Sequence, residues 1–180
     1  MRTPRAAAVP VWTAVLCSVA VLVAGCAGGP APRAWAASVC QALAPWRTTI
    51  ADLTTSTREQ MTARTSPAQA KEHLVRLFGG AERVSDQARR DVEDAGVPDV
   101  ERGEAVARGF VASLTGVRDA YGRARRSIEQ LDTGRAEEFY AGVHAAVAVL
   151  NREYDASALD LGALDSPELK RAFEEVPECR

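Results

Sequence analysis

The chain has 180 residues, a formal net charge of −2 at pH 7, 47% hydrophobic residues and 6% aromatic residues. This length favours a single domain. The near-neutral charge argues against a nucleic-acid-binding protein, which normally presents a basic face or tail. Beyond one N-terminal stretch, charged residues interrupt the apolar ones too often for a membrane-spanning helix.

The N-terminal segment has the composition of a secretory signal. Residues 1–10 carry Arg2 and Arg5 but no acidic residue, and residues 11–23 are almost wholly apolar. An apolar run of this length spans roughly 20 Å as a helix, which is less than the ~30 Å hydrocarbon core of a bilayer. We therefore predict a signal peptide over residues 1–25 rather than a permanent membrane helix.

The sequence Leu22-Val23-Ala24-Gly25-Cys26 resembles the lipobox of bacterial lipoproteins, although the family more often has Leu where Val23 stands. In that family the cysteine thiol receives a diacylglyceryl group, and a signal peptidase cleaves just before the cysteine. The resemblance implies that Cys26 carries fatty acyl chains such as palmitate. It also implies that the mature chain is anchored to the outer face of the cytoplasmic membrane. The alternative is ordinary secretion after cleavage near Ala24, with Cys26 left as a thiol.

The segment that follows Cys26 is rich in Gly and Pro, with the sequence Ala-Gly-Gly-Pro-Ala-Pro-Arg-Ala over residues 27–34. Such a composition disfavours regular structure. We predict that residues 26–34 form the lipid anchor and a flexible tether, and that residues 35–180 form one folded domain. Eight extended residues reach at most about 27 Å, so the domain is expected to lie close to the membrane.

Within this domain the apolar residues follow helical spacing. Residues 39–53, 70–92, 106–131 and 139–154 each place their apolar side chains on one helix face, and a shorter apolar pattern covers 169–173. No alternating pattern typical of a strand is present. Four long helices joined by short turns predict an all-α, antiparallel up-down-up-down four-helix bundle with a short C-terminal helix.

Several residues predict where these helices begin and end. Ser66-Pro67, followed by Gln69, is a capping box with Pro in the first turn, and Ser166-Pro167 repeats the start signal. Gly96 is a natural left-handed residue after a helix. Pro45 predicts a kink or a helix start near its position.

Two of the four cysteines are left for a disulfide once Cys17 leaves with the signal peptide and Cys26 is assigned to lipid. In an up-down-up-down bundle the first helix begins at the end where the fourth helix finishes. Cys40 and Cys179 therefore come to the same end, and we predict that they form a disulfide that closes the bundle. The alternatives are two unpaired thiols or a reactive cysteine, although neither cysteine has a histidine nearby in the sequence.

The segments at residues 39–46, 94–100, 164–169 and 177–179 resemble those of a group of small secreted proteins and lipoproteins of actinobacteria. The resemblance covers most of the mature chain. It implies a helical architecture and a terminal cysteine pair, but no particular activity.

The sequence contains no motif of a known catalytic or metal site. Phosphate-binding glycine loops, His-Glu-x-x-His, Cys-x-x-Cys and Gly-x-Ser-x-Gly are all absent. The two histidines are His73 and His144, and we place His144 at the edge of the buried face as a structural residue. Neighbouring acids such as Glu137 and Glu138 do not face each other on a helix. We therefore predict no catalytic, cofactor or metal site.

Three further features leave two interpretations open. The arginine clusters either contact anionic lipid headgroups or complement helix dipoles, and we favour the second interpretation; they are Arg89 with Arg90, and Arg123, Arg125 and Arg126. Trp35 either packs on the bundle or lies at the lipid interface. Gly109, Gly116 and Gly142 serve either internal packing or the docking of a partner helix.

Together these features predict a non-enzymatic, membrane-anchored extracytoplasmic lipoprotein that binds a protein or another envelope component. A second hypothesis is a small-ligand carrier or sensor with a site between the helices, beneath Gly79-Gly80 or beside Tyr121 and Tyr154. A third is a hydrolase or transferase whose residues converge only in the folded chain. Neither a cofactor nor nucleic acid is expected as a partner.

Overall fold

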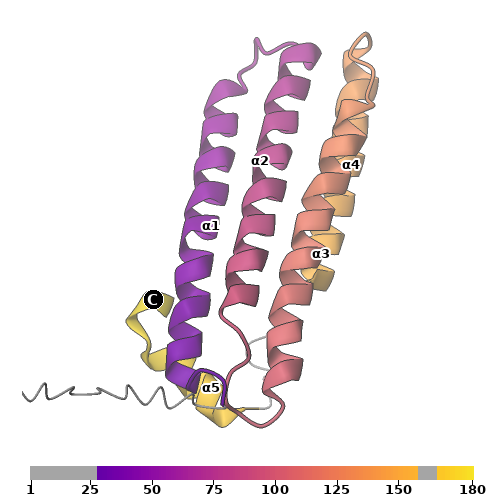
Figure 1. The fold of residues 1–180 in the computed structure, drawn as a ribbon. Helices are drawn as coiled ribbons and strands as arrows, with labels where there is room; N and C mark the ends of the chain where they lie inside the picture. Colours follow the sequence, from indigo (N-terminus) through magenta and orange to yellow (C-terminus); the bar gives the residue numbers. More distant parts are fainter. Residues whose placement is uncertain (1–27, 158–165) are drawn as a thin grey trace, which may run out of the picture.

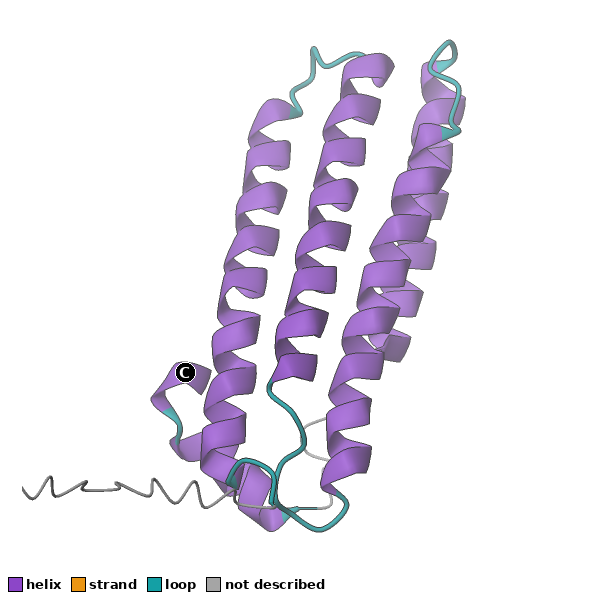
Figure 2. Cartoon of the chain, viewed as in Figure 1, coloured by secondary structure: helices purple, strands orange, loops and turns teal. Residues whose placement is uncertain are grey.

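The computed structural model describes residues 28–157 and 166–180, and the regular structure in these ranges is helical (Figure 2). The elements are α1 (Pro32–Gln60), α2 (Pro67–Asp94), α3 (Gly103–Glu129), α4 (Ala136–Ser157), α5 (Pro167–Glu175) and the 3-10 helix η2 (Pro177–Cys179). The first four helices alternate in direction, and α5 lies at the end where α1 begins (Figure 1). The predicted fold, four packed helices followed by a short C-terminal helix, is confirmed.

The helices pack in a definite order. α2 lies between α1 and α3, α4 packs mainly on α3, and α5 and η2 pack on α1. Among the described residues, the backbone of α1 does not come comparably close to α3 or α4, although the Trp35 ring of α1 reaches Phe110 of α3. The bundle is therefore built on the α2–α3 pair, with α1 and α4 attached to different members of it.

The buried residues form two main clusters at different levels of the bundle. One lies at the end where α1 begins and contains Trp35, Val39, Ala42, Ala88, Val92, Phe110, Leu114 and Leu169. The other lies towards the opposite end and contains Leu74, Phe78, Ala120, Ala124, Ile128, Ala146 and Leu150. A smaller cluster joins α1 to the C-terminal elements through Ala36, Ala172 and Val176.

The predicted helix signals are confirmed at three positions. Ser66 Oγ accepts a hydrogen bond from the Gln69 backbone N–H, and Gln69 Oε1 accepts one from the Ser66 N–H, which completes the capping box. Ser166 Oγ accepts from the Leu169 N–H in the same way. Gly96 has φ of +75°, the left-handed conformation that ends α2.

The start of α1 differs from the prediction. The helix begins at Pro32, so residues 32–34 belong to its first turn and not to a tether. Proline suits this position because the first turn needs no backbone N–H donor and its fixed φ is already helical. The helix continues through Pro45, which is exposed and lies inside α1. The predicted helix start near Pro45 is therefore wrong.

The predicted signal peptide over residues 1–25 and the predicted lipidation residue Cys26 lie outside the described residues. Within the described ranges, no helix combines the length and the hydropathy that are needed to cross a bilayer.

Candidate functional site

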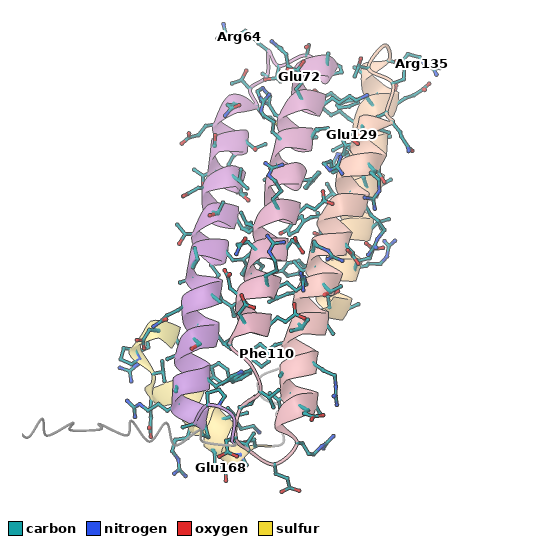
Figure 3. The ribbon with its side chains drawn as sticks, viewed as in Figure 1. Arg64, Glu72, Phe110, Glu129, Arg135 and Glu168 are labelled. Carbon is teal, nitrogen blue, oxygen red and sulfur yellow. A yellow bond between two sulfur atoms is a disulfide. The ribbon has the colours of Figure 1, made fainter. Side chains whose placement is uncertain are left out.

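Trp35 holds several elements together at the end of the bundle where α1 begins. Its side chain is fully buried, and its Nε1 donates a 2.8 Å hydrogen bond to the backbone carbonyl of Gly96. Its ring meets Phe110 and Phe173 edge to face, with centroids 5.2 and 6.0 Å away. Phe110 is labelled at this level of the bundle in Figure 3. Of the two interpretations of Trp35, packing on the bundle is therefore the one that holds.

The same end carries the disulfide between Cys40 of α1 and Cys179 of η2, whose Cα atoms are 5.0 Å apart. This bond confirms the predicted pairing. It excludes two unpaired thiols and a reactive cysteine at these positions, because both sulfur atoms are engaged. The bond ties the C-terminal elements to α1 across a sequence separation of 139 residues.

The segment between α2 and α3 is held against the start of the described chain. The Asp99 N–H donates a 2.9 Å hydrogen bond to the carbonyl of Pro30. Gly29 lies so close to the backbone carbonyl of Val97 that no side chain fits there, and Gly28 lies beside the Asp99 carboxylate. The N-terminal part of the described chain thus runs along residues 97–99.

An apolar groove of about 710 Å³ opens beside this segment, between the end of α2 and the first half of α3. Its volume lies within the ~300–1,000 Å³ typical of ligand sites, and its lining is mostly apolar. Val97 lines it and is 41% exposed, which is high for a large hydrophobic residue. The lining residues are Val92, Glu93, Gly96, Val97, Ala107, Arg108, Val111, Ala112, Thr115, Gly116 and Asp119.

A second hollow of about 470 Å³ adjoins this groove around the start of α3 and shares Val97 and Arg108 with it. The side chain of Arg108 pairs with Glu104 at 3.1 Å, and both side chains are largely exposed. Arg108 therefore stands at the rim between an apolar groove and a more polar hollow.

Above the groove, a network of charged side chains joins α2 to α3. Asp86 of α2 accepts hydrogen bonds from Arg89 and Arg90 of its own helix and from Arg118 of α3. Arg89 also pairs with Glu93, and Arg118 with Asp119, so both carboxylates that line the groove are neutralised. The hydrogen bond from Arg89, followed by those from Arg118 and Arg90, lowers the pKa of Asp86 in spite of partial burial.

Most of the other arginines that the sequence analysis singled out also meet carboxylates. Arg125 bridges Glu82 of α2 and Glu129 of α3, and Arg123 pairs with Glu153 of α4. These arginines join neighbouring helices. Neither of the two interpretations offered for the clusters, contact with lipid headgroups or interaction with a helix dipole, included this role.

The space beneath Gly79-Gly80, where the sequence analysis placed a ligand cavity, is filled. A Cβ atom at Gly80 would lie 2.7 Å from Leu53 Cδ1, and one at Gly79 would lie 3.2 Å from Arg125 Cδ. These glycines therefore allow close packing of α1 and α3 on α2.

The second predicted cavity position is also packed. Tyr121 and Tyr154 contact each other edge to face, with ring centroids 6.3 Å apart. Burial, with a smaller contribution from Tyr154, raises the pKa of Tyr121 to about 12.

Gly116 and Gly142 serve internal packing. A side chain at Gly116 would collide with Ser157 of α4, and one at Gly142 would collide with Leu131. Gly116 lines the groove as well, so the end of α4 lies next to the groove wall.

The histidines lie apart from the groove. His73 Nδ1 is 2.6 Å from Arg76 Nη2 on the same helix. His144 is exposed, so its predicted place at the edge of the buried face is wrong. Within residues 28–157 and 166–180, no three His, Cys, Asp or Glu side chains come together as metal ligands would.

The groove was not predicted from the sequence, although the sequence of α3 contains a pattern that indicates it. Ala107, Val111 and Thr115 recur four residues apart on α3, beside the main apolar stripe that faces the core. Ala107 and Val111 also pack against the buried cluster that contains Trp35, so this narrower stripe extends the apolar face of α3 beyond its fully buried part. Comparison with known proteins identified no relative: no protein-family model matches the chain, and neither does a curated protein or a solved structure.

Proposed function

We propose that this chain is a non-enzymatic binding module, held by a lipid on Cys26 to the outer face of the cytoplasmic membrane. The observation that carries the proposal is the apolar groove between α2 and α3, which opens at the end of the bundle where the described chain begins. A partner protein or another component of the envelope binds there.

The disulfide supports the extracytoplasmic location. Structural disulfides persist in oxidising compartments and are rare in the cytosol. Cys40–Cys179 joins the two ends of the domain. A chain that depends on this bond folds best after export.

The volume of the groove also favours the second candidate function, a small-ligand carrier. At about 710 Å³, the groove has room for a drug-sized molecule. A carrier binds such a molecule within the groove, whereas a protein-binding module receives only a few side chains of its partner there.

The anchor is tested by mass spectrometry of the mature chain from its native host. The expected N-terminal residue is Cys26 carrying a diacylglyceryl group, and a C26S variant is expected to lack both this modification and cleavage before residue 26. A mature chain with an unmodified N-terminus at another residue contradicts the anchor.

Binding is tested in living cells with a photo-reactive amino acid at position 97, in the groove. Val149 on α4 is the matched control, because it is 37% exposed against 41% for Val97. Position 97 is expected to capture a specific envelope component and position 149 is not. The same products from both positions, or substrate turnover by the purified protein, contradict the proposal.

A further inference from the structure

We propose that the α2–α3 groove binds one acyl chain of an anionic membrane lipid, with the headgroup at Arg108. This inference deepens the proposed function by naming the envelope component, and its link to the membrane rests on the lipid at Cys26. The acyl-binding chemistry of the groove does not depend on that lipid, so the two proposals can fail separately.

The groove opens at the end of the bundle that a lipid on Cys26 would hold at the membrane. Gly28 lies beside Asp99, and Gly29 lies against the carbonyl of Val97. Two residues of extended chain span about 7 Å, so a lipidated Cys26 keeps this end of the bundle at the bilayer surface. Val97 lines the groove, and the groove therefore opens where lipid molecules are the most abundant apolar ligands.

The length and the lining of the groove suit an acyl chain. Its α3 wall extends from Ala107 to Asp119, which at 1.5 Å per residue is about 18 Å. The hydrocarbon core of a bilayer is about 30 Å thick, so one leaflet supplies chains of about 15 Å. Val92, Val97 and Val111 give the groove aliphatic walls suited to such a chain.

Charge is distributed unevenly along the groove. Arg108 lies at the rim near the start of α3, where its pairing with Glu104 is exposed and therefore easily exchanged for another anion. The carboxylates of the groove lie further along it: Glu93 is paired with Arg89, and Asp119 with Arg118. This arrangement favours an anionic headgroup at Arg108 and the acyl chain directed away from it.

The groove itself is tested with the C26S chain, a fluorescent fatty acid and the methyl ester of the same fatty acid. We expect saturable binding of the fatty acid that V97D and A112E reduce at least about tenfold, because each places a charge in the lining. V149D is the matched control and is expected to bind like the unsubstituted chain. Val97, Ala112 and Val149 are all exposed, so the substitutions are compatible with folding, which circular dichroism checks.

The headgroup site is tested with R108Q. Loss of one rim charge is expected to weaken binding of the fatty acid by about fivefold and to leave binding of the uncharged ester unchanged. Equal effects on both probes overturn the role of Arg108. Absence of saturable binding, or binding that V97D and V149D change equally, overturns the groove.

The source of the acyl chain is tested with the lipidated chain in nanodiscs of phosphatidylglycerol that carries a spin label on its acyl chains. Entry of a membrane lipid is expected to broaden the methyl resonances of Val97 and Val111 but not those of Val149. If the Val97 and Val111 resonances stay sharp, no membrane lipid enters the groove. If C26S nevertheless binds the fatty acid, sharp resonances indicate that the unlabelled acyl chains of the protein's own anchor occupy the groove. If Cys26 proves not to be lipidated while C26S binds the fatty acid, the anchor fails and the acyl site stands.

Discussion

At Gly96 the backbone leaves α2 in a left-handed conformation, and its carbonyl accepts the hydrogen bond from Trp35. A side chain added at this position meets nothing within 4 Å, so space does not decide its effect. What remains is the backbone conformation, which favours glycine over residues that carry a Cβ atom.

Gly96→Ala is therefore expected to lower the free energy of unfolding by about 1 kcal/mol. Gly96→Asn is the matched variant and is expected to cost less, because asparagine tolerates the left-handed region better than alanine does. Urea unfolding of the three proteins measures both values. Equal losses for the two variants would contradict a conformational cause.

Asp86 is the second residue with an effect beyond its own helix, because three arginines converge on it. Asp86→Asn is expected to lower the free energy of unfolding by about 1–2 kcal/mol at pH 7, since the side chain is partly exposed and its hydrogen bonds are charge-assisted. Asp52→Asn, on the exposed side of α1, is the control and is expected to change little.

The sign of the pH dependence follows from the pKa of Asp86. Folding lowers this pKa below 3.8, so the folded state favours the ionised form. The stabilisation is fully present above the unfolded pKa and is lost as the pH falls through the folded pKa. The stability difference between the original chain and D86N is therefore constant near neutral pH and shrinks below about pH 4. A difference that stays constant into strong acid contradicts this role.

At the scale of elements, α5 and η2 pack on α1 through the buried residues Leu169, Ala172 and Val176 and through the contact of Phe173 with Trp35. The disulfide adds a covalent link to these contacts. Because it joins residues separated by 139 positions, it removes a large loop entropy from the unfolded chain.

Loss of the disulfide is expected to lower the free energy of unfolding by up to about 5 kcal/mol. C40A, C179A and the double variant should lose similar amounts, because each breaks the same bond. Denaturant unfolding without reductant measures the effect, and the original chain with reductant is the control. A double variant much less stable than both single variants would show that the two cysteines contribute independently.

The elements also show how far the sequence can predict this fold. The helix-end residues act through neighbouring backbone atoms, so the local sequence predicts their roles. They are Ser66, Ser166 and Gly96. The pairing of Cys40 with Cys179 followed from the order and direction of the helices.

The candidate site was not predicted, for a physical reason. Its walls come from α2 and α3, which are held together by shared buried clusters and by the ion pairs Asp86–Arg118 and Glu82–Arg125. Those contacts fix the register between the helices, and no local pattern encodes it. The burial of Trp35 likewise depends on Phe110 and Phe173, which are distant in the sequence.

At the scale of the whole molecule, the first part of α1 is buried against the rest of the bundle and its second part is not. The buried residues of α1 all lie between Trp35 and Ala42, in the part that meets the C-terminal elements. Beyond this part, Ile50 and Leu53 are only partly buried, and α1 makes no close packing with α4 among the described residues. Stability should therefore differ along this single helix, because local opening follows the density of buried contacts.

We expect the backbone amides of residues 48–60 to exchange with solvent deuterium at least about tenfold faster than those of residues 36–43. Helix α3 is the internal control: it has buried residues in both halves, Phe110 and Leu114 in one and Ala124 and Ile128 in the other. Its two halves should therefore exchange at similar rates. Reducing the disulfide should remove the contrast within α1 by loosening residues 36–43, while the second half of α3 stays protected. Uniform protection along α1 before reduction would mean that its exposed half is held by contacts other than those of the buried clusters.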